Sequence, residues 1–260
     1  MCRLYSSKTN ISLLLLRLLP LASFILIWEF ALHKKEHLVF YFGLPSKIGL
    51  YIINKTADGT LINDFLVTLS EAFFGFLIGN FIGTIIGLSL WFSNLIFQIA
   101  KPYIIALGSA PIFAFAPLMI VWFGTGFFSK VMMATLSTIF IALFQAYSGA
   151  EQVDRNYLKL MKSMRASKMQ VFRKVIAPSS IVWVIAAFKI NVGFALLGAF
   201  IGEYISSSEG LGHLILVASG LFDISLVLTG GLMLVVIALG LNYFVSLLEV
   251  PIKRLIVNLL

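Results

Sequence analysis

The stretch EAFFGFLIGNFIGTIIGLSLWF, residues 71–92, decides the fold class of this chain. After Glu71 it carries no charged residue as far as Phe92. A helix rises 1.5 Å per residue, so about 20 apolar residues cross the roughly 30 Å of hydrocarbon in a bilayer. The stretch therefore predicts a membrane-spanning helix.

Four glycines recur at every fourth position within this stretch. On a helix such a row forms one smooth groove, into which a second helix can pack closely. We expect tight packing within one subunit, and the alternative is an interface between subunits. In either case the role is structural, and the residues are Gly75, Gly79, Gly83 and Gly87.

The rest of the chain repeats the membrane pattern. Hydrophobic residues make up 60% of the 260 residues and charged residues only 12%, which excludes an ordinary water-soluble globular enzyme. We expect an all-α membrane protein with a single transmembrane domain over residues 1–260 and about six spans. The predicted spans are Leu13–Leu32, Glu71–Phe92, Pro102–Phe123, Ser129–Tyr147, Ile181–Ile205 and Ile224–Leu248.

The net charge of +8 indicates orientation in a membrane, not nucleic-acid binding. If the N-terminus is cytoplasmic, most of the 19 Lys and Arg residues lie on the cytoplasmic side. We therefore expect both termini inside. The basic residues that fall elsewhere are Lys34, Lys35, Lys47, Lys55 and Lys130 outside and Lys189 within a span.

Residues for catalysis or for a cofactor are not evident. No GxxxxGK[ST] run exists to cradle a nucleotide, so the chain should not hydrolyse ATP by itself. His33 and His37 flank Glu36, a spacing that could hold a metal but more often marks solvated polar residues. The single cysteine, Cys2, cannot form an internal disulfide. We expect no metal and no cofactor on this chain.

The largest polar segment is EQVDRNYLKLMKSMRASKMQVFRKVIAPSS, residues 151–180, between the fourth and fifth predicted spans. Apolar residues recur at helical spacing among the basic ones, which predicts two short amphipathic helices. We expect them to meet near Ala166 and Ser167 and to stop at Pro178. Such a segment could lie on anionic lipid headgroups or dock into a groove of a soluble partner.

Four positions inside the spans invite a role in transport. Pro111 and Pro117 each remove an amide donor in the third span, which also holds Ser109. Static kinks and a bend that lines or gates a pathway remain alternatives. Lys189 could line a pathway for an anion or polar substrate. The alternative is a structural role, in which it snorkels to the headgroups or pairs with Glu29 or Glu71.

Glu203 should lie at the outer end of the fifth span. There it could hold the segment that follows or contact another protein, and an exposed helix-end carboxylate is the alternative. It lies fourteen residues after Lys189, too far along the helix for the two to pair.

The basic segment resembles the cytoplasmic EAA loop of binding-protein-dependent ABC importer permeases, whose pattern is EAA, three residues, Gly, nine residues, then I-x-L-P. Anchored on Pro178, the pattern places Arg165 at the Gly position. Lys159, Leu160 and Met161 then stand at the EAA positions. Only the proline and an apolar residue match strictly.

Neighbouring segments make the resemblance more specific. APIFAFAPLMIVWFGTGFFSK, residues 110–130, is similar to the P-x-x-A-x-x-P-L-x-x-x-W-F-G segment of the nitrate, sulfonate and taurine branch. Lys189 takes that branch's basic position, and Glu203 with the later Gly-Leu-Gly resembles its E-x-I-x-x-x-x-G-L-G run. The resemblance covers about residues 45–250.

The resemblance implies a type I permease of a bacterial inner membrane that pairs with a second copy or a close relative. Two ATPase subunits, which hold ATP and Mg, would bind beneath, and a periplasmic or lipid-anchored binding protein would deliver the solute. A coupling helix would seat in the ATPase groove. Its residues would be Lys159, Leu160, Met161, Lys162, Ser163, Met164, Arg165, Ala166 and Ser167.

The solute is not fixed by the resemblance, because the branch carries nitrate, taurine, alkyl sulfonates, bicarbonate and thiamine-pyrimidine precursors. Lys189 favours a small anion. A secondary carrier or channel is the rival class, disfavoured by the long basic segment and by an expected lack of buried carboxylates suited to proton or sodium coupling. An intramembrane enzyme is excluded by the lack of paired catalytic groups.

Overall fold

A computed structural model describes residues 8–257, and every regular element within that range is helical. Cys2 lies outside the described residues. The elements are α1 (Lys8–Leu32), α2 (Glu36–Phe42), α3 (Pro45–Ala57), α4 (Thr60–Leu90), α5 (Asn94–Ser109), the 3-10 turn Ile112–Phe115, α6 (Ala116–Phe123), α7 (Phe127–Glu151), α8 (Arg155–Ser163), α9 (Lys168–Val171), the π-helical turn Phe172–Ile176, α10 (Ala177–Ser206), α11 (Leu211–Gly220) and α12 (Ile224–Val257).

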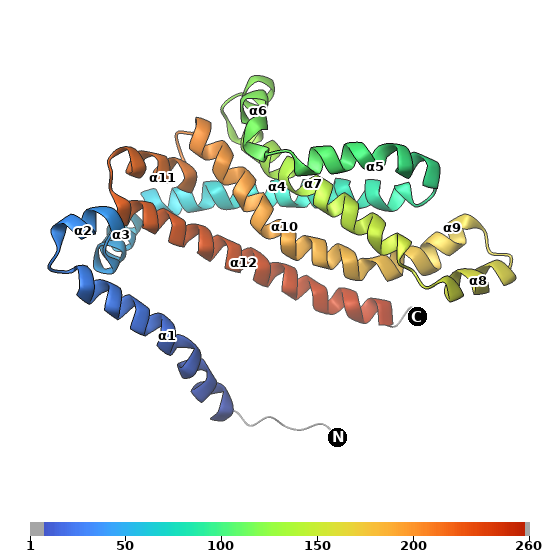
Figure 1. The fold of residues 1–260 in the computed structure, drawn as a ribbon, viewed down its shortest axis with the longest axis horizontal. Helices are drawn as coiled ribbons and strands as arrows, with labels where there is room; N and C mark the ends of the chain where they lie inside the picture. The colour runs from blue at the N-terminus through green and yellow to red at the C-terminus, as the bar shows by residue number, and fades with distance from the viewer. Residues whose placement is uncertain (1–7, 258–260) are drawn as a thin grey trace.

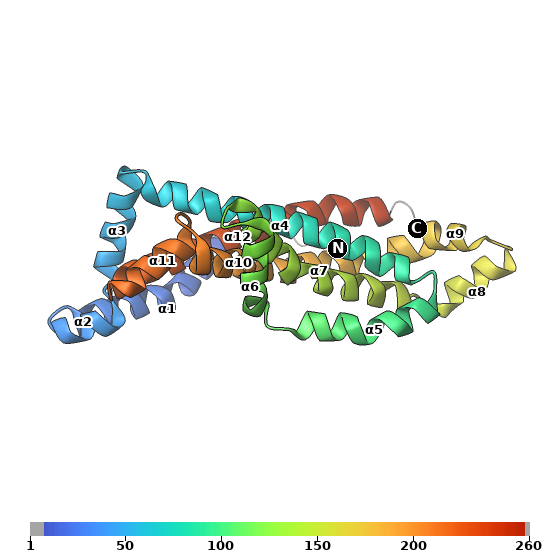
Figure 2. The same ribbon diagram turned by 90° about the horizontal axis from the view of Figure 1, so that it is seen from above.

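The long helices α4, α7, α10 and α12 run along the length of an elongated bundle (Figure 1). Each is long and apolar enough to cross a membrane. One end of the bundle carries α8 and α9, and the other carries α2, α3 and α11 (Figure 2). We call these the α8 end and the α11 end. The predicted first span falls in α1, which diverges from the bundle (Figure 1).

The α4–α7 seam forms the centre of the bundle. A Cβ added to Gly75, Gly79, Gly83 or Gly87 would overlap atoms of α7, so the glycine row lets two helix backbones meet. In lipid, helix association depends on such close packing, since apolar side chains gain little by leaving lipid tails. The row therefore lies inside one subunit.

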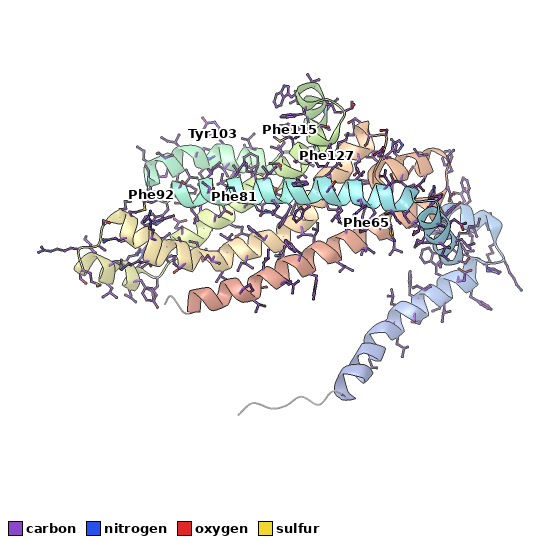
Figure 3. The ribbon with its side chains drawn as sticks, turned by 180° about the vertical axis from the view of Figure 1, so that it is seen from behind. Phe65, Phe81, Phe92, Tyr103, Phe115 and Phe127 are labelled. Atoms are coloured by element: carbon purple, nitrogen blue, oxygen red, sulfur yellow. The ribbon has the colours of Figure 1, made fainter. Side chains whose placement is uncertain are left out.

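Apolar side chains also cover the outside of the bundle. Phe81 and Tyr103 are labelled on its outer surface in Figure 3, and they are 67% and 68% exposed. Such large exposed apolar surface fits contact with lipid and would be costly in water.

The third predicted span, Pro102–Phe123, is wrong as a single helix. α5 begins earlier, at Asn94, where Ser93 caps it by accepting a hydrogen bond from the Ile96 amide at 3.3 Å. Residues 94–101, which precede the predicted span, are therefore helical. α5 ends at Ser109, and the chain bends by 93° before the helical segment Ile112–Phe123.

The two prolines of this segment have different effects. Pro111 lies in extended conformation at the break, where its fixed φ and missing amide donor prevent α5 from continuing. Pro117 lies in the first turn of α6, where a helix has no use for the amide donor. The bend thus belongs to Pro111, and Pro117 introduces no kink.

Pro178 does not stop the helix, contrary to expectation. The chain is helical from Lys168 to Ser206, and Pro178 lies in the first turn of α10. The turn Phe172–Ile176 just before it is π-helical. A widened turn can absorb the hydrogen bond that proline cannot make. The basic segment is therefore joined rigidly to a spanning helix.

Candidate functional sites at the two ends of the bundle

α8 protrudes at the tip of the α8 end (Figures 1 and 2). Asp154 caps it by accepting a hydrogen bond from the Asn156 amide at 2.8 Å. The inner side of the helix packs through Leu158 and Met161 against a buried cluster at the root of α7 and α10. That cluster consists of Ala150, Val153, Val175 and Ile176.

The outer side of α8 and the following turn carry exposed apolar side chains. Tyr157 is 54% exposed, Leu160 56% and Met164 69%. Lys159, Lys162 and Arg165 are exposed among them. An exposed apolar row flanked by cations is a surface suited to an apolar groove with acidic edges.

The turn after α8 holds the remaining residues of the expected coupling helix, which is therefore shorter than predicted. α8 ends at Ser163, and Arg165 has a left-handed backbone with φ +53°. Ser167 then starts α9 with a capping box, in which its amide donates to the Gln170 side chain at 2.7 Å. This structure explains the two expected helices and their junction.

Lys168 is used within the chain. Its ammonium donates to the backbone carbonyl of Phe92 and lies 5.8 Å from the Trp91 ring centroid. Phe172 packs against both of these aromatic rings. Lys168 thus fastens α9 to the α4–α5 connection and is less available to a partner than Lys159 or Lys162.

The α11 end holds a buried polar cluster, which we call the polar corner: Thr68 and Glu71 of α4, Lys130 of α7, Glu203 of α10 and the loop before α11. Glu203 is fully buried, at 0% exposure. Its carboxylate accepts hydrogen bonds from the Thr68 hydroxyl and the Gly212 amide, both at 2.6 Å. Glu203 therefore holds the segment that follows α10, and it is not an exposed helix-end carboxylate.

Two glycines make room for the Glu203 carboxylate. A Cβ on Gly210 would lie 2.8 Å from its Oε2, and one on Gly212 would lie 2.9 Å from the same atom. Gly210 also has φ +99°, a backbone conformation that side chains rarely adopt. The spacing from Glu203 to the Gly-Leu-Gly run thus has a physical reason.

Lys189 pairs with Glu249 of α12, and the expected partners Glu29 and Glu71 are wrong. The Lys189 ammonium lies 2.5 Å from Glu249 Oε2. Glu29 lies instead near His33, with 3.4 Å between Oε1 and Nδ1, and accepts from the Ser46 amide at 3.0 Å. Glu71 belongs to the polar corner.

Ser109 lies where α5 meets the middle of α7. With Gly108 and Gln145 it borders a cavity of about 270 Å³. The cavity is mostly apolar, since Phe140, Ile141 and Phe144 of α7 form much of its wall. Of the expected pathway residues, Ser109 and Pro111 thus lie at the break between α5 and α6, while Lys189 lies on α10 facing α12.

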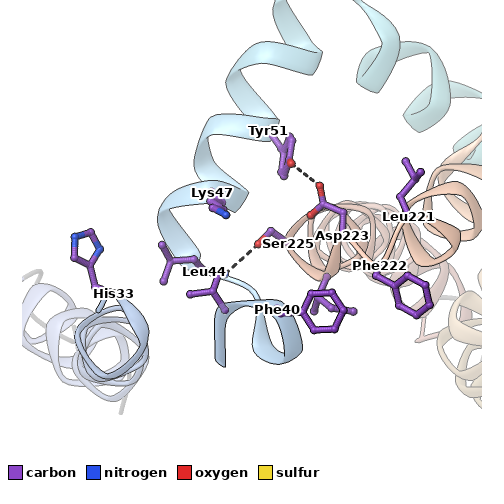
Figure 4. Close-up of a pocket in the computed structure, with 11 residues that line it drawn as sticks. His33, Phe40, Leu44, Lys47, Tyr51, Leu221, Phe222, Asp223 and Ser225 are labelled. Carbon is purple, nitrogen blue, oxygen red and sulfur yellow. Dashed lines mark hydrogen bonds between the residues drawn. The ribbon is translucent and has the colours of Figure 1, made fainter. Parts of the chain in front are cut away.

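A larger cavity, of about 600 Å³, lies at the α11 end between α2, α3 and the start of α12 (Figure 4). The Tyr51 hydroxyl donates to the Asp223 carboxylate there, and this hydrogen bond raises the pKa of Tyr51. The Leu44 amide donates to the Ser225 hydroxyl at 3.1 Å. These bonds fasten α3 to α12.

Sequence reasoning missed the buried charges. Lys130 was counted with the basic residues on the outer side, but it is buried, at 2% exposure. Glu71 and Glu203 are buried carboxylates, so the expected lack of such groups was wrong. Glu71 carried a signal, because it is the only acidic residue in its apolar stretch. No cluster of three or more His, Cys, Asp or Glu suited to a metal occurs among the described residues.

Comparison with known proteins shows the family to which this chain belongs. Residues 79–254 match the family described as binding-protein-dependent transport system inner membrane component. The chain belongs to this family. It is therefore a multi-pass inner-membrane permease subunit of an ABC importer, a non-enzymatic component that works with an ATPase and a substrate-binding protein.

Curated relatives agree with the family. A probable ABC transporter permease of Haemophilus influenzae is 34% identical over 180 residues, covering 69% of this chain and 74% of the relative. The formylaminopyrimidine transport permease ThiX of Halalkalibacterium halodurans is 29% identical, covering 65% of this chain and 68% of the relative.

A solved structure agrees in fold. The permease of the inward-facing MetNI methionine ABC transporter matches with a TM-score of 0.65 and 17% identity, over 79% of this chain and 99% of that one. The type I permease fold expected from sequence is confirmed. The long helices of this permease thus form the core of a type I importer subunit.

Proposed function

We propose that α8 and the turn to Ser167 are the element through which the ATP-binding subunits drive this permease. The observation that carries the proposal is the division of α8 into two sides. Leu158 and Met161 anchor it to the roots of α7 and α10, while Tyr157, Leu160 and Met164 stay exposed. A helix that transmits motion from a bound partner must be anchored to the rest of the protein on one side and exposed to the partner on the other.

Motion of α8 would pass directly into the membrane. The root cluster joins α8 to the π-helical turn, and helix continues from Lys168 to Ser206. When the ATPase pair closes around ATP, the attached helices would tilt and change the side to which the pathway opens. ATP must bind the outward-opening state more tightly for this to work.

The charges on α8 supply specificity for the partner. Lys159, Lys162 and Arg165 are exposed, so an ATPase groove with acidic residues at its edges is the matching surface. ATP and Mg would be held by that ATPase. Lys168, fastened to Phe92 and Trp91, contributes little to this contact.

Orientation follows the same division of charge. The α8 end would be cytoplasmic, with both termini, and the α11 end would face the binding protein. Of the lysines counted as outer, Lys34 and Lys35 directly precede α2, and Lys47 and Lys55 lie on α3, so these four are at the α11 end (Figure 1). Lys130, near the start of α7, bonds to the carbonyl of Ser206 at the end of α10. We propose that residues 1–260 form one permease domain. The outer surface of this domain would contact membrane lipid.

The solute is a small polar molecule, and a second copy of the permease would complete the pathway. α6 projects from the side of the bundle (Figure 1), and the Ser109 cavity opens between α5 and α7. Pro111 sets the bend there, and Pro117 starts the next helix. Because Glu249 neutralises Lys189, this lysine gives no reason to prefer an anion. Transport of a pyrimidine by the relative ThiX fits a polar solute.

Copurification of the ATP-binding subunit tests the proposal. Leu160→Asp should abolish copurification while the permease stays folded, since Leu160 is exposed and the change removes only outer contacts. Leu221→Asp is the matched control, because Leu221 is 71% exposed at the α11 end. Equal copurification of Leu160→Asp and wild type would refute the docking role of α8.

A further inference from the structure

Two carboxyl groups and one ammonium group meet in the polar corner. Glu71 is 2% exposed, Glu203 0% and Lys130 2%. They come from α4, α10 and α7, which pack together at the α11 end. The Glu71 carboxyl hydrogen-bonds to that of Glu203, and the charge of Lys130 acts on both. This site is independent of the docking role of α8.

The hydrogen bonds around Glu203 favour an ionised acceptor. Oε1 accepts from the Thr68 hydroxyl and Oε2 from the Gly212 amide, each at 2.6 Å. The Thr68 oxygen in turn accepts from the Leu211 amide at 2.9 Å. Both oxygens of Glu203 thus face donors from the protein, which favours the carboxylate form.

The surroundings of Glu71 are different. Its Oε2 is buried and has no hydrogen-bond partner. The Lys130 ammonium donates to the backbone carbonyls of Ser206, at 2.9 Å, and Thr125. Glu71 therefore lacks the protein donors that would stabilise an ionised, buried carboxylate.

Counting charge decides the protonation of the pair. With both carboxyls ionised, the corner would hold two negative charges against one positive charge away from water. Two carboxylates in contact do not both ionise under such conditions. We infer that one proton resides on Glu71 and is donated to the Glu203 carboxylate, whose charge is balanced by Lys130.

The nearest other titratable groups act against ionisation of both carboxyls at once. Asp64 of α4 accepts a hydrogen bond from the Gly210 amide at 2.9 Å and acts on Glu203 as a further negative charge. His213 of α11 and Glu209 of the preceding loop act on Asp64, as does Lys55 of α3. A second ionised carboxylate at Glu71 would add to this negative charge.

The proton is a resident part of the structure and not a transported ion. Glu71 and Glu203 are both buried, and the hydrogen bonds of Thr68 and of the Glu203 carboxylate fasten α11 to α4 and α10. A proton-coupled carrier would have to release such a proton in each cycle. The buried carboxylates of this permease therefore do not make it a proton-driven carrier.

A pair of isosteric variants tests the inference. Glu71→Gln should leave the melting temperature of the purified permease within a few degrees of wild type, because an amide donates where the protonated acid did. Glu203→Gln should lower it by about 10 °C, because Lys130 loses its counter-charge and Oε2 loses an acceptor site. Equal losses in the two variants, or a larger loss in Glu71→Gln, would overturn the assignment.

Three further measurements keep the test decisive. The infrared carbonyl stretch of a protonated carboxylic acid should be present in wild type and absent in Glu71→Gln; its absence from wild type contradicts a resident proton. If Glu203→Gln yields no folded protein, adding Lys130→Met should restore folding by removing the unpaired cation; failure to restore it refutes the charge balance. ATP-driven uptake should persist in Glu71→Gln, and its loss in a folded variant would mean that the proton moves.

Discussion

The two ends of this permease treat charge in opposite ways. At the α8 end, Lys159, Lys162 and Arg165 are exposed beside exposed apolar side chains. At the α11 end, Lys130 and Glu203 are buried and satisfied by neighbouring groups. Charges left open at a protein surface contribute to recognition, whereas charges satisfied inside fix a conformation. We therefore propose that the α8 end binds a partner, whereas the buried charges of the α11 end hold helices together.

The largest loss of stability is expected from a substitution in the α4–α7 seam, which joins the two ends. In Gly79→Val, the new Cβ would lie 2.8 Å from the Thr135 carbonyl oxygen and overlap Thr138, so α4 and α7 must separate. We expect a loss of about 3 kcal/mol or more, beyond ordinary overpacking, because backbone atoms are hit. Yield of monodisperse protein and melting temperature measure it.

Gly240→Ala is the control for the seam, since nothing lies within 4 Å of a Cβ there. It should change stability by less than about 1 kcal/mol. A Gly79→Val variant as stable as Gly240→Ala would show that α4 and α7 are not in close contact, and would remove the rigid link between the two ends.

The buried end predicts the next effect. Gly210→Ala combines a strained φ of +99° with a Cβ that would lie 2.8 Å from Glu203 Oε2. We expect a cost of about 2–4 kcal/mol. Gly220→Ala at the other end of α11 has nothing within 4 Å and should be nearly neutral. Similar thermal unfolding of the two variants would argue against the tight enclosure of Glu203.

The exposed end predicts a smaller effect, of opposite sign. Arg165 adopts φ +53°, which costs a residue with a side chain about 1–2 kcal/mol, while glycine loses about 0.5–1 kcal/mol more entropy. Arg165→Gly should therefore stabilise the turn by about 0.5–1 kcal/mol, seen as slower hydrogen exchange in α8. It should also weaken binding of the ATPase if the arginine charge matters.

Arg165→Ala separates these two consequences, because it removes the charge and keeps the strain. ATPase binding weakened equally by Ala and Gly would assign the effect to charge. Full binding by both variants would contradict a contact between Arg165 and an acidic groove.

The smallest effect concerns the bond between α3 and α12 at the α11 end. The Asp223 carboxylate raises the pKa of Tyr51, so folding favours the protonated phenol. This contribution is full below about pH 10, the ordinary tyrosine pKa, and is lost as pH rises above it. Tyr51→Phe should thus lower stability slightly near neutral pH and flatten the alkaline decline. An unchanged alkaline profile in Tyr51→Phe would refute the role of this bond.

Local patterns predicted what depends on neighbours along the chain. The apolar stretch at residues 71–92 predicted the seam helix, and the mixed basic and apolar residues 155–167 predicted α8 and its turn. The length of an apolar stretch relative to the bilayer and the helical spacing of apolar residues suffice to predict such helices. The break at Pro111 followed in part, because proline removes one donor but does not fix the 93° angle.

Long-range pairs were not predictable from one sequence. Lys189 and Glu249 meet only because α10 and α12 pack together, and Lys130 reaches the polar corner only because α7 lies between α4 and α10. The local sequence can assign a charged residue to a loop or a span, but it does not show which other helix packs against that residue. The continuation of helix through Pro178 was missed for a local reason, since a π-helical turn accommodates the proline.

Site-specific cross-linking tests most directly whether the exposed end binds the ATPase. In a Cys2→Ser background, Leu160→Cys on α8 should cross-link to the ATP-binding subunit, and Leu221→Cys at the α11 end should not. Both native side chains are well exposed, at 56% and 71%. Cross-linking of the ATP-binding subunit from position 221 and not from position 160 would contradict both the docking role of α8 and the proposed orientation.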